Sequence, residues 1–266
     1  MTAILTDIRE MLSEQLQYRE LLTQMTRRDL LLRYKQTIMG FGWAVFMPLV
    51  NTAVFSVIFT RVAPLDTGVP YPLFAYSGLL VWNFFASSLR FSVISLTANT
   101  SLVTKVYFPR EIFPFSAIIV CLVDALVGST VLVALMAYYG VWPTAAIVYL
   151  PLVVVVHLMF TAGVALLLAM ANLFFRDVKY LFEVVITVWM FTTSVLYPVS
   201  LVGGRTGAVL ALNPMTPIVD AYRAVLLFDR SPFDLSFGLA SLAAFLTLAG
   251  AWIVFHRAEF KFAENI

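Results

Sequence analysis

Residues 112–139 read IFPFSAIIVCLVDALVGSTVLVALMAYY and contain one charged side chain, Asp124. After a tight turn at residues 140–143, residues 143–171 carry no Asp, Glu, Lys or Arg, and His157 lies near their middle. A run of about 20 apolar residues is long enough for one helix to cross a membrane. The two runs therefore predict a helical hairpin that spans a membrane.

Four further apolar runs are separated by charged residues or by proline and glycine, which mark their boundaries. They cover residues 38–60, 71–89, 181–199 and 235–255, and Glu183 is the one charged residue within them. Together with the hairpin, these runs predict an all-α integral membrane protein with six transmembrane helices.

The composition excludes several other classes of protein. The chain has 266 residues, of which 61% are hydrophobic and only 12% charged, whereas soluble domains carry about 25% charged residues. A single cysteine, Cys121, excludes a disulfide scaffold, and a net charge of +2 argues against nucleic-acid binding. No glycine is followed by lysine, so the phosphate-binding loop of an ATPase is missing, and two distant histidines give no metal or catalytic site.

The positions of lysine and arginine predict the orientation, because cytoplasmic segments retain positive charge during insertion. Thirteen of the 17 basic residues lie in the N-terminal segment, the second and fourth connections and the C-terminal tail. The other four are Arg61, Arg205, Arg223 and Arg230, in the first and fifth connections. Both termini are therefore expected to be cytoplasmic.

Two segments do not fit a plain bundle of hairpins. Residues 1–37 alternate apolar and charged side chains, which predicts an amphipathic helix in the cytoplasmic interface; four acidic residues argue against a signal peptide there. Residues 201–228 are too apolar for an exposed loop and are interrupted by glycine and proline. We expect them to re-enter the membrane as two half-helices between spans five and six, with a covered surface loop as the alternative.

The second connection contains KVYFPREIFP at residues 105–114. Its two prolines lie five residues apart, and each favours a helix that starts just after it. Lys105, Arg110 and Glu111 are then expected on a short amphipathic element at the cytoplasmic face. Interfacial anchoring by positive charge is the alternative, and it accounts for Lys105 and Arg110 but poorly for the order Phe-Pro-Arg-Glu.

This segment resembles the hallmark of the type-2 ATP-binding-cassette permeases that export polysaccharides. Three other segments resemble the same family in the same order along the chain. They are RRDL at 27–30 with RYK at 33–35, Gly40, Trp43 and Pro48; NLFFRDV at 172–178; and LNPMTP at 212–217 with Arg223 downstream. The resemblance thus covers essentially the whole chain.

The resemblance implies a half-transporter in a bacterial inner membrane, in which a homodimer of this permease pairs with two copies of a separate ATPase. The ATPase would bind ATP and magnesium, and this chain would need no cofactor and no catalytic residue. The expected coupling or gating residues are Lys105, Phe108, Pro109, Arg110, Glu111, Arg176 and Asp177. For the Arg176–Asp177 pair, an exposed ion pair that contributes about 0 to 1 kcal/mol is the alternative.

The resemblance also implies the cargo, a lipid-linked polysaccharide. O-antigen of lipopolysaccharide is the first expectation, because the motifs look closest to that branch, while capsule and teichoic acid exporters share much of the pattern. Sugar rings present apolar C–H faces that can lie on aromatic rings, so an aromatic wall is expected along the path. The candidates are Trp43, Phe46, Trp189, Phe191 and Tyr197, and an interfacial aromatic belt or lipid-facing bulk is the alternative.

Asp124 and His157 lie at similar depth in the predicted hairpin, each about 20 Å from its turn at 1.5 Å per residue. They are expected to form a structural pair between spans three and four. Ionisable residues inside a membrane are also functional candidates, so a rival class is a proton-coupled carrier that uses Asp124, His157 and Glu183. A membrane scaffold without transport is a third possibility.

Overall fold

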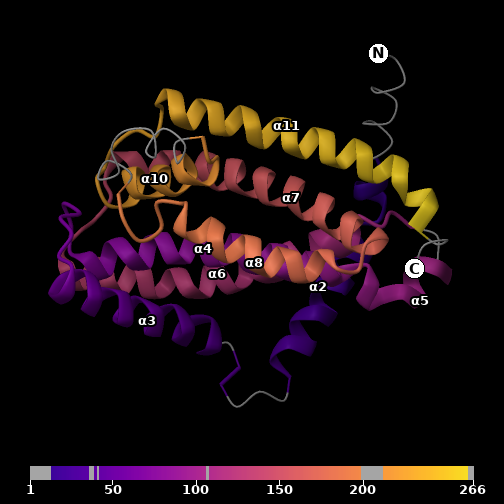
Figure 1. Ribbon diagram of the computed structural model, residues 1–266, viewed down its shortest axis with the longest axis horizontal. Helices are drawn as coiled ribbons and strands as arrows, with labels where there is room; N and C mark the ends of the chain where they lie inside the picture. Colours follow the sequence, from indigo (N-terminus) through magenta and orange to yellow (C-terminus); the bar gives the residue numbers. More distant parts are fainter. Residues whose placement is uncertain (1–12, 36–38, 41, 106–107, 199–211, 263–266) are drawn as a thin grey trace.

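A computed structural model describes residues 13–35, 39–40, 42–105, 108–198 and 212–262 of the chain. Within these residues the secondary structure is entirely helical (Figure 1). The helices are α2 (Arg19–Tyr34), α3 (Gly42–Val57), η1 (Ile58–Val62), α4 (Tyr71–Ser95), η2 (Thr97–Asn99), α5 (Thr100–Lys105), α6 (Ile112–Tyr139), η3 (Ala145–Tyr149), α7 (Leu150–Phe174), α8 (Val178–Phe191), α10 (Met215–Leu226), α11 (Leu235–Ala258) and η5 (Glu259–Lys261).

Five helical segments of the described part are long and apolar enough to cross a membrane: Gly42–Val62, Tyr71–Ser95, Ile112–Tyr139, Ala145–Phe174 and Leu235–Lys261. They confirm the all-helical membrane architecture. The predicted span at 181–199 contains the 14-residue α8, which measures about 21 Å and is shorter than the roughly 30 Å of hydrocarbon. The count of six spans stays a prediction.

The bundle has two ends, which Figure 1 places at its right and left. We call the end that carries α5, the start of α6 and η5 the near end. The far end carries η1, the start of α4 and residues 227–234. The long helices run between the two ends, so each end gathers segments that are distant in the sequence.

Helix α4 lies at the centre of the bundle, where it contacts α3, α6, α7, α8 and α10. Two-thirds of its most apolar stretch is buried, compared with 11% for the segment that includes α3. Helix α7 is half buried and packs along α11. A Cβ at Gly163 of α7 would lie 2.7 Å from the backbone nitrogen of Leu248, so the two backbones touch only because this residue is glycine.

Helix α2 packs against α6 rather than standing alone on a surface. Asp29 accepts a hydrogen bond from Ser116, and Arg33 and Tyr34 both contact Asp124, twelve residues beyond the start of α6. The alternation of apolar and charged side chains in this segment therefore belongs to a helix that packs one of its faces against α6. Its orientation relative to a membrane stays a prediction, and residues 1–12 and 36–38 lie outside the described residues.

Helix α10 rises from the middle of the bundle to the far end. At its start, Asn213 bonds Trp189 of α8, whose ring packs on Trp82 and Phe85 in the centre of α4. Beyond its end, Asp229 bonds Thr144 at the far end. Residues 199–211, which include the first part of the re-entrant segment predicted at 201–228, lie outside the described residues.

Candidate functional site

The predicted coupling motif is divided at the near end into an exposed part and a buried part. Lys105 ends α5, a short helix that projects from the bundle, and it is exposed (Figure 1). Phe108, Pro109, Arg110 and Glu111 are buried, although sequence reasoning placed the two charged residues on a surface element. The motif therefore anchors the start of α6 and leaves α5 outside.

The buried charges of this motif contact the end of α11. Arg110 lies 3.9 Å from a carboxylate oxygen of Glu259, and its guanidinium donates a 3.4 Å hydrogen bond to the carbonyl of Val103. Glu111 lies 3.5 Å from Nδ1 of His256. These contacts connect the second connection to the C-terminal part of the chain, which no local motif indicated.

Arg176 and Asp177 are exposed in the turn between α7 and α8, also at the near end. The same motif supplies a residue that sequence reasoning quoted but gave no role, Asn172. Its amide donates to the carbonyl of Val93 at 2.9 Å, and its oxygen accepts from the backbone of Lys179 at 3.2 Å. Asn172 thus holds the turn that carries Arg176 and Asp177 against α4.

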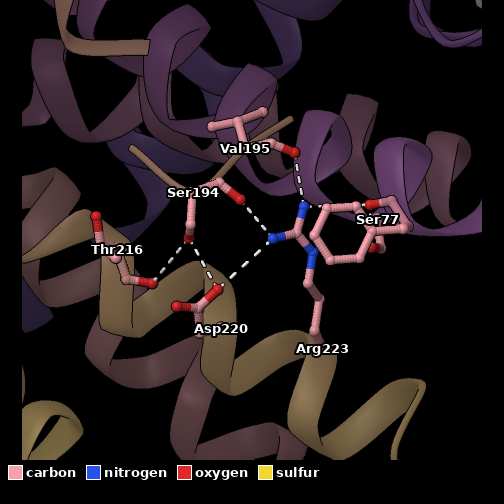
Figure 2. A network of polar contacts seen from close by, with 7 residues as sticks. Ser77, Ser194, Val195, Thr216, Asp220 and Arg223 are labelled. Atoms are coloured by element: carbon pink, nitrogen blue, oxygen red, sulfur yellow. Dashed lines mark hydrogen bonds and ion pairs between the residues drawn. The ribbon is translucent and has the colours of Figure 1, made fainter. Parts of the chain in front are cut away.

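A buried arginine organises the far half of the molecule (Figure 2). Arg223 of α10 is 2% exposed, and its guanidinium donates to the carbonyls of Val195 at 2.6 Å, Phe74 at 3.2 Å and Ser194. It also lies 3.6 Å from Asp220. The sequence placed Arg223 in the fifth connection, and the structure shows it buried in α10 of that connection, where its donors satisfy carbonyls of the turn after α8 and of α4.

We call this arrangement the Arg223 clasp, formed by Arg223, Asp220, Ser194, Val195 and Phe74. Ser194 donates to Asp220 at 2.8 Å, which orients the carboxylate beside the guanidinium. The guanidinium also lies 3.5 Å from the centre of the Phe74 ring. The clasp therefore joins three segments: α4, the turn after α8, and α10.

Asn213 makes a second connection between α8 and α10. Its side-chain oxygen accepts from the indole of Trp189 at 2.9 Å and from the backbone of Met215 at 3.1 Å. Its amide donates to the hydroxyl of Thr193 at 2.8 Å and to the carbonyl of Thr192. Asparagine is required here because it offers donors and acceptors together.

The aromatic residues predicted to line a path fall into two groups. Trp43, Phe46 and Phe191 are exposed by 42%, 45% and 55% in this single chain. Trp189 and Tyr197 instead pack against the main core, and the Tyr197 hydroxyl donates to the carbonyl of Phe191. Only the first group lies on the outer faces of α3 and α8.

The predicted pair of Asp124 and His157 is wrong. Asp124 is paired with Arg33 and Tyr34 of α2, whereas His157 lies 3.3 Å from the Tyr222 hydroxyl and packs edge-on against Phe84. The prediction relied on the similar distance of both residues from the turn of the hairpin. The two side chains nevertheless contact different neighbours. Glu183 pairs with neither Asp124 nor His157 but with Arg90, at 2.8 Å. The three residues of the proposed proton relay are therefore not in contact with one another.

These features define a helical, multi-pass membrane protein whose far half is joined by buried polar contacts and whose near end is charged. The chain belongs to the ABC-2 type transporter family, whose model matches residues 20–227. It is 33% identical over 254 residues to the O-antigen export system permease protein RfbA of Myxococcus xanthus, covering 94% of this chain and 96% of the relative. Two permease proteins of the same name from Klebsiella pneumoniae are 29% and 27% identical, each covering 92% of this chain and 94% of the relative.

The family assignment decides between the classes that the sequence left open. The chain is the membrane subunit of an ABC transporter rather than an enzyme, and a partner ATPase subunit belongs to such a transporter. The proton-coupled carrier is thereby excluded.

Proposed function

We propose that this chain exports O-antigen, as a lipid-linked polysaccharide, across a bacterial inner membrane with energy from ATP hydrolysis on the partner subunit. The observation that carries this proposal is the similarity over more than nine-tenths of the chain to three permeases named for O-antigen export. Capsule and teichoic acid are the alternative cargoes.

We infer that two copies of the chain enclose the path. A saccharide cannot cross about 30 Å of hydrocarbon exposed, and one bundle of this size packs its own centre with α4. The apolar faces of α3 and α8 are the least covered by the chain itself, and they carry Trp43, Phe46 and Phe191. In this proposal those three aromatics face the cargo, while Trp189 and Tyr197 support them from behind.

We further propose that α8 together with residues 192–198 forms the fifth of six crossings. Helix α8 covers about 21 Å, and the chain continues to the far end, where the Leu196 carbonyl accepts a hydrogen bond from Tyr71. Helix α10 then forms the outward half of a re-entrant segment, held by the Arg223 clasp. With six crossings both termini lie on one side, and in this proposal that side is the cytoplasm, because 13 of the 17 basic residues lie in the segments expected there.

The near end is the proposed coupling surface. Lys105, Arg176 and Asp177 are among its exposed charges, whereas Arg110 and Glu111 fix the base from which α5 projects. In this proposal the ATPase contacts the exposed charges, and movement passes through the buried ones to α6.

The cargo is tested by deleting the gene and measuring surface polysaccharides. Loss of surface O-antigen, with accumulation of lipid-linked O-antigen inside the cell and restoration by the wild-type gene, is expected. Unchanged O-antigen together with loss of a capsular or other polymer would show that the cargo is a different polysaccharide.

The coupling surface is tested by reversing exposed charges, Lys105→Glu with Arg176→Glu, in the reconstituted complex. Transport-coupled ATP hydrolysis is expected to fall at least tenfold while the amount of folded permease stays constant. Arg61→Glu is the matched control, because Arg61 is an exposed arginine at the far end. Equal activity of all three proteins would contradict the assignment of the surface.

A further inference from the structure

A group of three buried side chains at the near end lies outside the proposed path and outside the exposed coupling surface. It comprises Glu111, just before α6, His256 in the last turn of α11, and Glu259 at the start of η5. Each offers one ligand atom, and these atoms lie within 4.8 Å of one another. His256 and Glu259 are three residues apart, a spacing that puts both side chains on one face of a helix.

Burial of these three ionisable side chains without full hydrogen bonding is unfavourable for the stability of the fold. Glu111 is 1% exposed, Glu259 4% and His256 9%. Oε2 of Glu111 and Nδ1 of His256 are buried and have no hydrogen-bond partner. Buried carboxylate and imidazole groups are normally hydrogen-bonded, and an unpartnered one requires an explanation such as a bound ion.

Of the two distances between His256 and the carboxylates, one matches the separation between the ligands of a metal ion and the other is slightly longer. Nδ1 of His256 lies 3.5 Å from Oε1 of Glu111 and 3.9 Å from Oε1 of Glu259. Zinc binds imidazole nitrogen and carboxylate oxygen at about 2.0 to 2.2 Å in a tetrahedron, which separates neighbouring ligand atoms by about 3.3 to 3.6 Å. Small movements of the side chains would therefore bring all three atoms into contact with one ion.

Arg110 lies behind the cluster, with its guanidinium 3.9 Å from a carboxylate oxygen of Glu259. The backbone nitrogen of Arg110 also lies 3.5 Å from the same carboxylate oxygen. In metal sites, hydrogen bonds from neighbouring groups to the ligand side chains orient those ligands toward the ion.

We propose that Glu111, His256 and Glu259 bind one divalent transition-metal ion, with zinc as the preferred ion, and that this ion joins the coupling segment to the end of α11. The mixed nitrogen and oxygen ligands favour zinc over magnesium or calcium, which take oxygen ligands alone. The ligands come from positions more than 140 residues apart, so the ion would fix the base of α5 in the folded chain. This inference does not depend on which polysaccharide is exported.

The test uses the full-length chain in detergent, purified without a histidine tag. Elemental analysis after dialysis is expected to give about one zinc per chain. Zinc added to chelator-treated protein at a hundredfold excess over Kd is expected to raise the melting temperature by about 5 °C or more.

Variants separate this site from adventitious binding. His256→Gln is expected to weaken zinc binding at least tenfold, and Glu259→Asp, which keeps the charge, is expected to weaken it less. Glu183→Gln is the matched control, because Glu183 is a half-exposed carboxylate already paired with Arg90, and it should bind zinc like the wild type. If the wild type holds no zinc and its melting temperature does not respond, or if His256→Gln binds zinc equally, the cluster is an ion-pair network and the proposal is overturned.

Discussion

Two buried arginines at opposite ends of the molecule solve the same physical problem in different ways. Arg223 donates to three backbone carbonyls at the far end, and glycine at position 78 allows the guanidinium to lie against α4. The guanidinium of Arg110 at the near end has its nearest acceptors at 3.4 and 3.9 Å, and Nε of both arginines has no hydrogen-bond partner. Arg223 makes more hydrogen bonds than Arg110, and shorter ones, so the far end is the more tightly held region.

This difference suits a protein that transmits movement. The end that carries the buried, loosely bonded charges is the one at which we expect the ATPase to act, and loosely bonded elements can change position at small cost. At the far end, the Arg223 clasp and Asn213 fix the non-helical segment after α8 against α4 and α10. Substitutions of buried groups at the far end should therefore cost more stability than matched substitutions at the near end.

Arg223→Met should have the largest effect on the stability of the fold. It removes the guanidinium from three carbonyls and from Asp220, and breaking a buried pair costs about 3 to 5 kcal/mol. Arg110→Met should cost about 1 to 2 kcal/mol, because its hydrogen bonds are long. Unfolding by denaturant in detergent micelles measures both, with Arg230→Met as an exposed control. An equal or larger loss for Arg110→Met would remove the contrast between the ends.

Gly78→Ala should disturb the same clasp from the opposite side. An added Cβ would collide with the Arg223 guanidinium and lie 2.5 Å from the carbonyl oxygen of Val195. Overpacking of this kind costs about 1 to 3 kcal/mol. Gly250→Ala is the matched control: Gly250 lies in α11 with open space around it, so alanine should be neutral or stabilising by up to about 1 kcal/mol. Equal melting temperatures for the two variants would show that α4 does not need a glycine there.

Arg33 is an intermediate case, because it pairs with one carboxylate and stacks on Phe91 at 3.8 Å. A double-mutant cycle with Arg33→Met and Asp124→Asn should give a coupling of about 1 kcal/mol. A second cycle with Asp124→Asn and His157→Leu should be additive within about 0.5 kcal/mol, because those side chains have different partners. Coupling in the second cycle but not in the first would restore the hairpin pair that the sequence suggested.

The spans were predictable because bilayer thickness dictates the length of an uncharged run. The run at 112–139 coincides with α6, and those at 71–89, 143–171 and 235–255 each differ from the observed helix mainly at one end. The break after Phe191 was not predictable from hydropathy, since residues 192–194 are polar but uncharged. It depends on tertiary partners, namely Asn213 and the Arg223 clasp.

The candidate sites were predictable in their location along the chain but not in their contacts. The motif at 105–114 does lie at one end of the bundle, as expected. The burial of Arg110 and Glu111 depends on Glu259 and His256, and hydrophobic periodicity carries no information about which distant helix end lies alongside. The same limit applies to Asp124, which lies in the middle of α6 and whose partner is on a segment treated as a separate surface helix.

The smallest effect is expected for Asp229, the exposed counterpart of the buried charges at the far end. Hydrogen bonds from the Thr144 hydroxyl, and then from the backbone N–H groups of Ala146 and Thr144, hold the pKa of this carboxyl below its ordinary value. A lowered pKa in the folded state means that the contact stabilises the fold at a pH above the unfolded value of about 3.9, and that this stability is lost as the pH falls through the folded pKa.

The difference in melting temperature between the wild type and Asp229→Asn should therefore be small and constant near neutral pH and shrink below about pH 4. Asp66→Asn is the matched control, because Asp66 is an exposed aspartate at the same end that accepts a bond only from the backbone of Gly68. Since Asp229 connects the segment after α10 to the start of η3, a difference that grew on acidification would mean that the protonated side chain makes the better contact. The contact of Asp229 with Thr144 would then add nothing to the contacts that the Arg223 clasp makes at this end.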